Sequence, residues 1–308
     1  AVTNMVTVFG GTQFFNQDIG NWIVDNVNDM RSMFDGAVAF NQDIGGWNVG
    51  QVDDMSDMFA GAIAFNQDIS GWNVANVNDM SGMFSNATAF NQDLGRAGGW
   101  NVSGVSDMRL MFENATSFNQ NLGGWDVTNL NLAVNMFNNS GLSVSNYDNL
   151  LTGWSGQSLR SNVSFGAQGI YYCTAGAVRT NIELSFNWTI TDEGPGCIAV
   201  YDGTNTTNPE IANTTIDFGS AAMGVGKTHR FTILNRLSSN INGISVSVGG
   251  AFSVVPFATT INSGSTLAID IDLSGAAAGS FTETVIITNS DTPGNYKFTI
   301  TGAVTATP

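Results

Sequence analysis

The residues in this sequence that are best suited to bind a polar ligand or a cation are asparagines and aspartates that recur at a fixed interval. The phrase Phe-Asn-Gln-Asp-Ile/Leu starts at Phe15, Phe40, Phe65 and Phe90, each 25 residues after the previous copy, and a fifth copy starts at Phe118. In an extended segment, the Asn and Asp side chains point away from the face that carries the Phe side chains. We therefore expect one polar, ligand-binding surface whose central members are Asn41, Asp43, Asn66, Asp68, Asn91 and Asp93.

The oxygens of this surface could bind a polar ligand or a cation. Neighbouring strands lie ~4.8 Å apart, so Asp43, Asp68 and Asp93 would form a file of like charges that amides, water or a cation must screen. Calcium accepts carboxylate and amide oxygens at variable geometry, and it is the one cofactor that the pattern admits, with these three aspartates as its ligands. Because no Asp-x-Asp-x-Asp loop occurs, the sequence favours a hydrogen-bonded polar ladder over a calcium site.

Two further files recur with the same period. One is aromatic, and its large apolar area favours a buried row over an exposed platform for stacking sugar rings. The other is acidic and falls where short helices are expected to start, so that negative charge would suit the helix dipole. The aromatic file is Trp22, Trp47, Trp72, Trp100 and Trp125, and the acidic file is Asp29, Asp54, Asp79 and Asp107.

The inventory of reactive side chains argues against an enzyme. The chain has one histidine, His229, so neither a Ser-His-Asp nor a Cys-His set can be assembled with confidence from the sequence. The glycine pairs lack the lysine and the strand-helix context of a phosphate-binding loop. We predict a non-enzymatic protein.

The charge balance limits the class of partner. The 308 residues include 9 Lys plus Arg and 25 Asp plus Glu, for a formal charge of −16. Nucleic acids and anionic membranes need basic patches, so neither is an expected partner. No run of 18 apolar residues occurs, so no membrane span is predicted.

The period also predicts the elements that position these residues. Phe65, Gln67 and Ile69 alternate with polar residues as in a strand, and Val77, Met80, Met83 and Phe84 follow helical spacing. A fixed period of this size is typical of a solenoid of stacked units. We predict an α/β solenoid of 25-residue coils, similar in build to leucine-rich repeats, over residues 1–154.

The remaining chain predicts two more parts. We expect residues 155–200 to form a C-terminal cap of the solenoid, stapled by a disulfide between Cys173 and Cys197 in an oxidising compartment; two buried free thiols are the alternative. Residues 201–308 contain short alternating segments separated by Gly, Asn and Ser clusters, which predicts an all-β immunoglobulin-like sandwich.

The first repeat is incomplete at its start. Met5 and Phe9 precede Phe15 by the same number of residues as Met30 and Phe34 precede Phe40. Because an uncapped coil would expose an apolar face, we expect either preceding chain or a module packed on this coil.

The repeat consensus Phe-Asn-Gln-Asp-(Ile/Leu)-(Ser/Gly)-Gly-Trp-(Asn/Asp)-Val, followed by Met-Ser-x-Met-Phe, resembles the BspA-type leucine-rich-repeat surface proteins of bacteria. Departures from it are the insertion at Arg96, Asn121 in place of Asp, and Ala133 in the last unit. The last part, with Ile216-Asp-Phe-Gly219 and Phe231-Thr-Ile-Leu-Asn235, resembles HYDIN or choice-of-anchor-D immunoglobulin-like modules. The resemblance implies display at the cell surface or in the medium of a bacterium, with export by a type IX-like route.

These features support two hypotheses of function. The first is an adhesion or ligand-binding protein whose repeat surface contacts a polysaccharide or protein on another surface, with the sandwich as a spacer. The second is a structural segment of a surface filament, stalk or layer, in which the partners are other copies or modules of the assembly.

Overall fold

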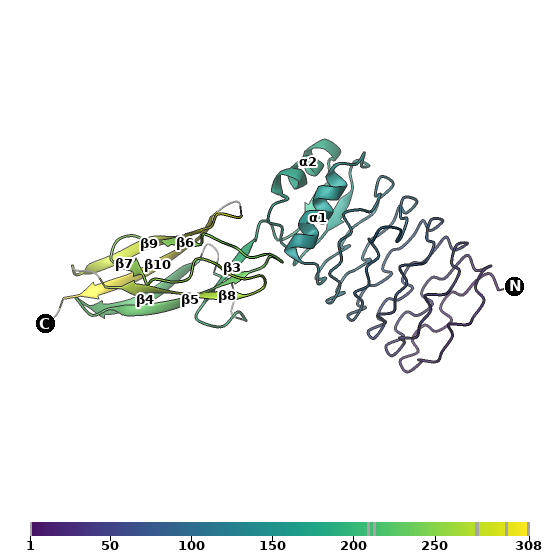
Figure 1. Ribbon diagram of the computed structural model, residues 1–308, viewed down its shortest axis with the longest axis horizontal. Helices are drawn as coiled ribbons and strands as arrows, with labels where there is room; N and C mark the ends of the chain where they lie inside the picture. The colour runs from purple at the N-terminus through teal and green to yellow at the C-terminus, as the bar shows by residue number, and fades with distance from the viewer. Residues whose placement is uncertain (1, 208–209, 212–213, 275–276, 293–294, 307–308) are drawn as a thin grey trace. The chain divides into compact units, whose positions relative to one another are not determined.

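The chain forms two units, seen in a computed structural model that describes residues 2–207, 210–211, 214–274, 277–292 and 295–306 (Figure 1). The first unit is Ala1–Pro195 and the second is Gly196–Pro308. The first unit carries the repeats followed by two helices and two short strands, and the second is built from strands.

The repeats stack in register, so that each residue lies beside its own equivalent in the next coil. Parallel bridges join Asn4 to Asp29, Asp29 to Asp54, Asp54 to Asp79, and Asp79 to Asp107. In Figure 1 the successive coils lie side by side along the first unit. The 25-residue period of the sequence is therefore the period of the stack, with the three-residue insertion at Arg96 taken up between Asp79 and Asp107.

The predicted strand and helix within each coil are wrong, because in the described chain the first helix or strand begins at Val144. Alternate amides, those of Met80, Gly82 and Phe84, donate to carbonyl groups of the following coil at 2.7–2.9 Å. Between them, the Met83 amide donates to the Met80 carbonyl at 3.2 Å in a turn. An amide used between coils cannot make the i→i−4 bond of a helix. The helical spacing of the methionines therefore reflects successive turns that all bring apolar side chains inward.

The interior of the stack is a set of aromatic files. Phe34 and Phe40 stack within one coil at a centroid distance of 4.0 Å, and Phe34 stacks on Phe59 of the next coil at 5.4 Å. Trp47 and Trp72 lie parallel at 6.5 Å and are 4% and 2% exposed. Each of the buried indoles donates its Nε1–H to a carbonyl of the preceding coil, as from Trp72 to Ile44 at 3.1 Å. The tryptophan file is thus core, as the sequence favoured, except for Trp22, which is 42% exposed.

Regular elements cover the far end of the stack. They are α1 (Val144–Ser155), β1 (Ser164–Gly166), α2 (Gly176–Phe186) and β2 (Thr189–Thr191). Helix α1 spans the boundary expected between residues 154 and 155, and its Trp154 continues the tryptophan file by donating to the Leu122 carbonyl at 3.1 Å. Phe165 meets Phe137 edge-on at 67°, which ends the run of parallel rings.

Both cysteines of the chain, Cys173 and Cys197, are disulfide-bonded, so the predicted disulfide is confirmed. Beside Cys173, the buried carboxylate of Asp148 accepts hydrogen bonds from the amides of Cys173, Thr174 and Ala175 at 2.9–3.0 Å. These amides lie in the segment that leads into α2, and because Asp148 belongs to α1, its carboxylate ties α1 to the start of α2.

The second unit consists of two four-stranded sheets. One has the order β4-β10-β9-β6, with β10 parallel to β4, and the other has the order β3-β5-β8-β7. Strand β3 begins ahead of the sandwich start expected at residue 201. The buried core contains Phe218, Phe231 and Phe298. The strands are β3 (Ile198–Asp202), β4 (Thr215–Ala222), β5 (Lys227–Asn235), β6 (Ser245–Ser247), β7 (Phe252–Val254), β8 (Thr266–Leu273), β9 (Gly279–Thr288) and β10 (Tyr296–Thr305).

Each coil reverses direction at a residue with positive φ. The equivalent positions have φ between 52° and 63° and are Thr7, Ser32, Asp57, Gly82, Leu110 and Asn135. The left-handed conformation costs an L-residue roughly 1–2 kcal/mol, less for Asn, whose short polar side chain bonds locally. Thr7, which is β-branched, and Leu110, which is bulky, are thus the residues least suited to their conformation in this series.

We expect Leu110→Asn to stabilise the first unit by about 1 kcal/mol, because it removes this left-handed strain. Urea unfolding followed by tryptophan fluorescence measures this unit alone, since all seven tryptophans lie within residues 1–195. Leu132→Asn is the matched control, because Leu132 and Leu110 are both 37% exposed and Leu132 has an ordinary φ. An unchanged or lower midpoint for Leu110→Asn would show that the leucine is not strained.

Candidate functional site

The predicted polar surface exists, and its asparagines form a continuous ladder between coils. The Asn41 side-chain oxygen accepts from the Asn66 backbone amide at 2.9 Å, and Asn66 accepts from the Asn91 amide at 2.9 Å. Glutamines reinforce each step, as where Gln92 Nε2 donates to Asn66 Oδ1 at 2.9 Å. The side-chain amides of asparagine and glutamine therefore make the bonds between coils that the sequence predicted from paired backbone strands in this segment.

The ladder runs into the cap. Asn119 Oδ1 accepts from the Ser143 amide at 2.8 Å and from Asn146 Nδ2 at 2.9 Å. Ser143 is also the N-cap of α1, because its hydroxyl accepts from the Asn146 amide. The same polar file thus joins the stack to the first helix.

The aspartates beside the ladder close turns within their own coils. Oδ1 of Asp43 accepts from the Gly45 amide at 2.9 Å, and Oδ1 of Asp93 accepts from the Gly95 amide at 3.2 Å. In the fifth copy the oxygen of Asn121 accepts from the Gly123 amide at 3.0 Å, so an amide serves the turn as well as a carboxylate. The negative charge is not required by the turn.

Asp68 has the most specific environment of the three predicted aspartates. Its Oδ1 accepts from both the amide and the hydroxyl of Ser70, and Arg96 Nη1 of the insertion lies 3.8 Å from its Oδ2. The hydroxyl bond, with smaller contributions from the amide bond and Arg96, lowers the pKa of Asp68 below its ordinary value.

The structure thus sorts the predicted site residues by role. Asn41, Asn66 and Asn91 hold neighbouring coils together through their side-chain oxygens. Asp43, Asp68 and Asp93 are exposed beside them. Within the described parts of the chain, there is no group of three or more His, Cys, Asp or Glu side chains placed to hold a metal ion.

A second acidic run lies on the turns that were predicted to be helix starts. Asp29, Asp54, Asp79 and Asp107 accept from the amide two residues later, as a helix cap would, although no helix follows. Arg31 bridges two coils, with Nη2 2.9 Å from Asp29 and Nε 3.4 Å from Asp54. The prediction that these charges complement a helix dipole is therefore wrong, and the aspartates close turns instead.

Asp57, which the sequence did not single out, lies near this run and carries a charge that folding disfavours. Its carboxylate lies against Gly82 of the next coil, where an added Cβ would come within 2.0 Å of Oδ1. Desolvation, followed by repulsion from Asp35, Asp79 and Asp54, raises the pKa of Asp57. The 25-residue period marks this position in the sequence, because Asp57 stands where the adjacent coils have the uncharged residues Ser32 and Gly82.

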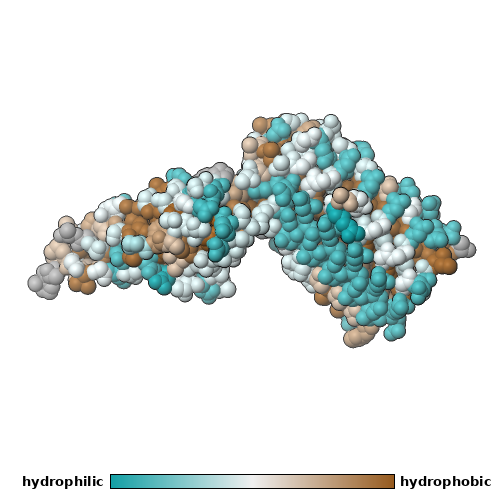
Figure 2. All heavy atoms as spheres, in the orientation of Figure 1, coloured by the Kyte–Doolittle hydropathy of each residue, from teal (hydrophilic) through white to brown (hydrophobic). Residues whose placement is uncertain are grey.

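Polar surface and negative charge concentrate on the first unit. Figure 2 shows a hydrophilic band along the stacked coils. Residues 1–195 hold 18 acidic and 5 basic residues, for a formal charge of −13 out of −16 in the chain. This field attracts cationic groups and repels anionic ones.

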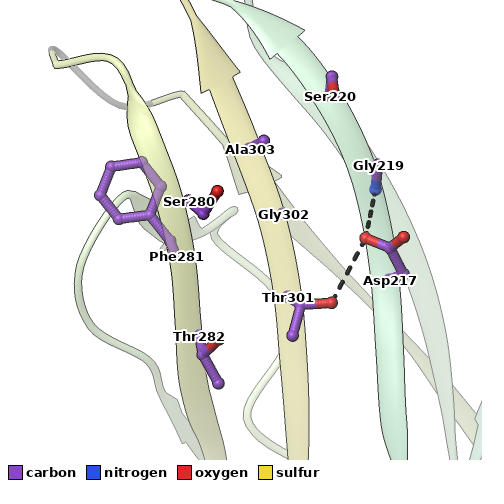
Figure 3. Close-up of a pocket in the computed structure, with 9 residues that line it drawn as sticks. All are labelled: Asp217, Gly219, Ser220, Ser280, Phe281, Thr282, Thr301, Gly302 and Ala303. Carbon is purple, nitrogen blue, oxygen red and sulfur yellow. Dashed lines mark hydrogen bonds between the residues drawn. The ribbon is translucent and has the colours of Figure 1, made fainter.

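The second unit carries a shallow hollow of about 270 Å³ on the face of β4, β10 and β9 (Figure 3). Asp217 Oδ1 accepts there from the Gly219 amide at 2.8 Å and from the Thr301 hydroxyl at 3.3 Å. The other lining side chains are small or hydroxylated, apart from Phe281. His229 is not part of this lining; it contacts Asp202 and lies 5.0 Å from each of the Phe218 and Phe231 rings.

Comparison with known families assigns the repeats. The family described as "Mycoplasma protein of unknown function, DUF285" matches residues 1–96 and 45–154, which together make up half of the chain. The chain belongs to this family. The family described as "HYDIN/CFA65/VesB-like, Ig-like domain" matches residues 210–303, in agreement with the two-sheet unit. No curated protein matches the chain.

Solved structures give weaker likenesses. A family 123 glycoside hydrolase from Clostridium perfringens is 11% identical, with a TM-score of 0.30 over 36% of this chain and 28% of that one. The VesB protease of Vibrio cholerae is 11% identical, with a TM-score of 0.24 over 35% of this chain and 32% of that one. The matched part spans about a third of each of those proteins. At such TM-scores neither likeness bears on the fold or activity of this chain.

Among the described residues, no helix combines the length and apolar character needed for a transmembrane segment.

We expect Asn66→Ala to destabilise the first unit by about 1 kcal/mol, because the Asn91 amide and Gln92 lose their shared acceptor. Asn66→Asp keeps an acceptor and should lose less. Asn73→Ala is the control, since among the described residues Asn73 accepts only a local bond, from the Ala75 amide at 3.3 Å. Urea midpoints followed by tryptophan fluorescence give the comparison, and equal losses for Asn66→Ala and Asn73→Ala would contradict a ladder between coils.

We expect Asp57→Asn to stabilise the first unit at neutral pH. The folded state raises the pKa of Asp57, so the ionised form is disfavoured by folding and stability is lost as the pH rises through the unfolded and then the folded pKa. The gain should therefore disappear below about pH 4, where the carboxyl is protonated in both states. Asp68→Asn is the control of opposite sign, because the pKa of Asp68 is lowered. A gain for Asp57→Asn that persists in acid would assign the effect to packing or to the better fit of asparagine to the positive φ at this position.

Proposed function

We propose that this chain is a non-enzymatic extracellular protein of a bacterial surface, which binds a ligand through the repeat unit and uses the immunoglobulin-like unit as a spacer. The observation that carries the proposal is the exposed row of Asp43, Asp68 and Asp93. In each aspartate, Oδ1 accepts the hydrogen bond that closes a turn. In the fifth copy the side-chain amide of Asn121 closes the same turn, so the turn does not require a negative charge. The second carboxylate oxygen of each residue is not used in that turn bond and is the group that a ligand would meet.

The charge of the repeat unit narrows the ligand class. A unit with a formal charge of −13 repels anionic polysaccharides and favours neutral polysaccharides or the basic face of a protein. Calcium, bound between ligand and carboxylates, would be a cofactor of such binding, because it takes oxygen ligands from both sides. The resemblance of the repeats to BspA-type surface proteins supports display outside the cell, with export by a type IX-like route.

The second candidate is a purely structural role as a segment of a stalk, filament or layer. It is favoured by the use of Asn41, Asn66 and Asn91 in holding coils together, which leaves half of the predicted site with a stacking function. In that case the aspartates only keep the surface hydrated.

The triple variant Asp43→Asn/Asp68→Asn/Asp93→Asn tests the site in the full chain. We expect it to keep its fold, since an amide closes this turn in the fifth copy, and to lose at least tenfold in affinity, which corresponds to about 1.4 kcal/mol. The measurement is binding to immobilised neutral polysaccharides and to basic surface proteins, with calcium and with a chelator.

Asp25→Asn/Asp53→Asn/Asp126→Asn is the matched control, because it removes three exposed charges of the same unit away from the row. Equal affinities of the two triple variants would show that only the net charge affects binding, and would contradict a binding site at Asp43, Asp68 and Asp93. Failure of the unmodified chain to bind either class of probe would favour the structural role.

A further inference from the structure

Three large apolar side chains lie together on the outside of the two coils that begin at Asp107 and Leu132. Leu110, Leu132 and Val134 are 37%, 37% and 43% exposed. Leu132 and Val134 stand on either side of a buried alanine in one segment, and the Leu110 amide donates to the Val134 carbonyl at 3.0 Å. The three side chains therefore form one surface, which we call the apolar patch.

The sequence changes from polar to apolar at the patch. The equivalent residues of the second, third and fourth coils are polar, charged or glycine, and they are Asp29, Asp54 and Asp79, then Arg31, Ser56 and Ser81, then Ser32, Asp57 and Gly82. The coil that begins at Asp79 lies on one side of the patch, and the bridge from Ala133 to Phe165 places β1 on the other. A missing neighbour therefore does not account for the exposure, and clustering of this kind marks an interaction surface.

Leu110 contributes to the patch against its backbone preference. Its φ is 60°, in the left-handed region that is costly for a bulky residue, whereas the adjacent coils have Gly82 and Asn135 at this position. Residues held in costly conformations concentrate at functional sites, because function can require what stability does not. The position of Leu110 is thus explained by an exposed apolar contact and not by the stability of the coil.

Unpaired carboxylates border the patch on the side of the fourth coil. The Asp57 carboxylate lies against Gly82, which is next to Leu110 in the stack, and Asp79 lies in the same coil as Gly82. Among the described residues, neither Asp57 nor Asp79 forms an ion pair, whereas the neighbouring Asp107 is paired with Arg109 at 2.6 Å. A surface that complements the patch is therefore apolar, with a positive charge beside it.

The second unit carries a surface of this chemistry on the turn between β4 and β5. Within the described part of that unit, Val225 is the one exposed large apolar side chain, at 59%. Lys227, two residues later, is exposed and makes no ion pair with the residues described. Arg230 and Arg236 of the same unit are both paired with carboxylates. The turn therefore presents an apolar side chain and a free cation together.

We propose that the β4–β5 turn of one copy of this chain docks on the apolar patch of a second copy. In this contact Val225 lies on the patch and Lys227 faces the bordering carboxylates. The two copies contribute different surfaces, so the contact is heterologous and joins copies head to tail. Because the surfaces are small, the contact is weak and forms at high protein concentration. It is separate from the row of aspartates proposed to bind ligand and does not depend on it.

Sedimentation equilibrium of the full chain tests the proposal. The weight-average mass should rise above 32.5 kDa with concentration. Leu132→Ser/Val134→Ser removes the patch, and Val225→Ser/Lys227→Ser removes the turn, so each variant alone should associate at least about tenfold more weakly. All four side chains are exposed, so both variants should fold, which circular dichroism checks.

An equimolar mixture of the two variants gives the sharpest result. One variant keeps the turn and the other keeps the patch, so the mixture should recover a single contact and approach twice 32.5 kDa. A mixture that stays at 32.5 kDa, or an unmodified chain that has this mass at every concentration, would overturn the proposal.

Two further variants separate docking from stability. Leu110→Asn, expected above to stabilise the first unit, should weaken association, whereas a purely structural leucine would leave it unchanged. Val38→Ser/Ile63→Ser is the matched control, because these side chains are 36% and 47% exposed at equivalent positions of adjacent coils. It should not change association, and a loss equal to that of Leu132→Ser/Val134→Ser would contradict docking at the patch.

Discussion

The first unit depends on one constraint, the stacking of coils in register, which places every residue beside its own equivalent. Alternate amides of one coil bond to carbonyls of the next, and phenylalanine and tryptophan rings stack along the same direction. Parallel rings gain from this arrangement because each buries a face of the next. The hydrogen bonds fix the register, and the rings supply the apolar area that makes the register stable.

The same constraint explains the unusual polar composition. A charge repeated with the period would lie beside a like charge at every step. Even at Asp57, whose equivalents Ser32 and Gly82 are uncharged, burial and the nearby carboxylates of Asp35, Asp79 and Asp54 raise the pKa. An amide side chain has both a donor and an acceptor, so it can stack on itself, as Asn114 does by donating to Asn86 at 3.1 Å. Asparagine is therefore the polar residue that a stack in register tolerates best, and charged residues account for only 11% of the chain.

Stacking also separates structural roles from those available to a ligand. The asparagine oxygens bond to the next coil, whereas the aspartates close turns that asparagine can also close. Because a neutral residue would close the same turns, the aspartates are better candidates for contacting a ligand than the asparagines beside them.

The sequence alone determined the period, the buried tryptophan file, the polar surface and the disulfide, because each depends on which residues recur or pair and not on the path of the backbone. It also indicated most strands of the second unit through their alternation. It could not determine the conformation within a coil, since Met80, Met83 and Phe84 have the same spacing in a helix as in successive turns. Only the tertiary structure decided between them, because the competing bond partner of each amide lies in the next coil, about 25 residues away in sequence. For the same reason, the sequence placed Asn66 and Asp68 on one surface but could not divide them into a residue that holds the coils together and one that faces solvent.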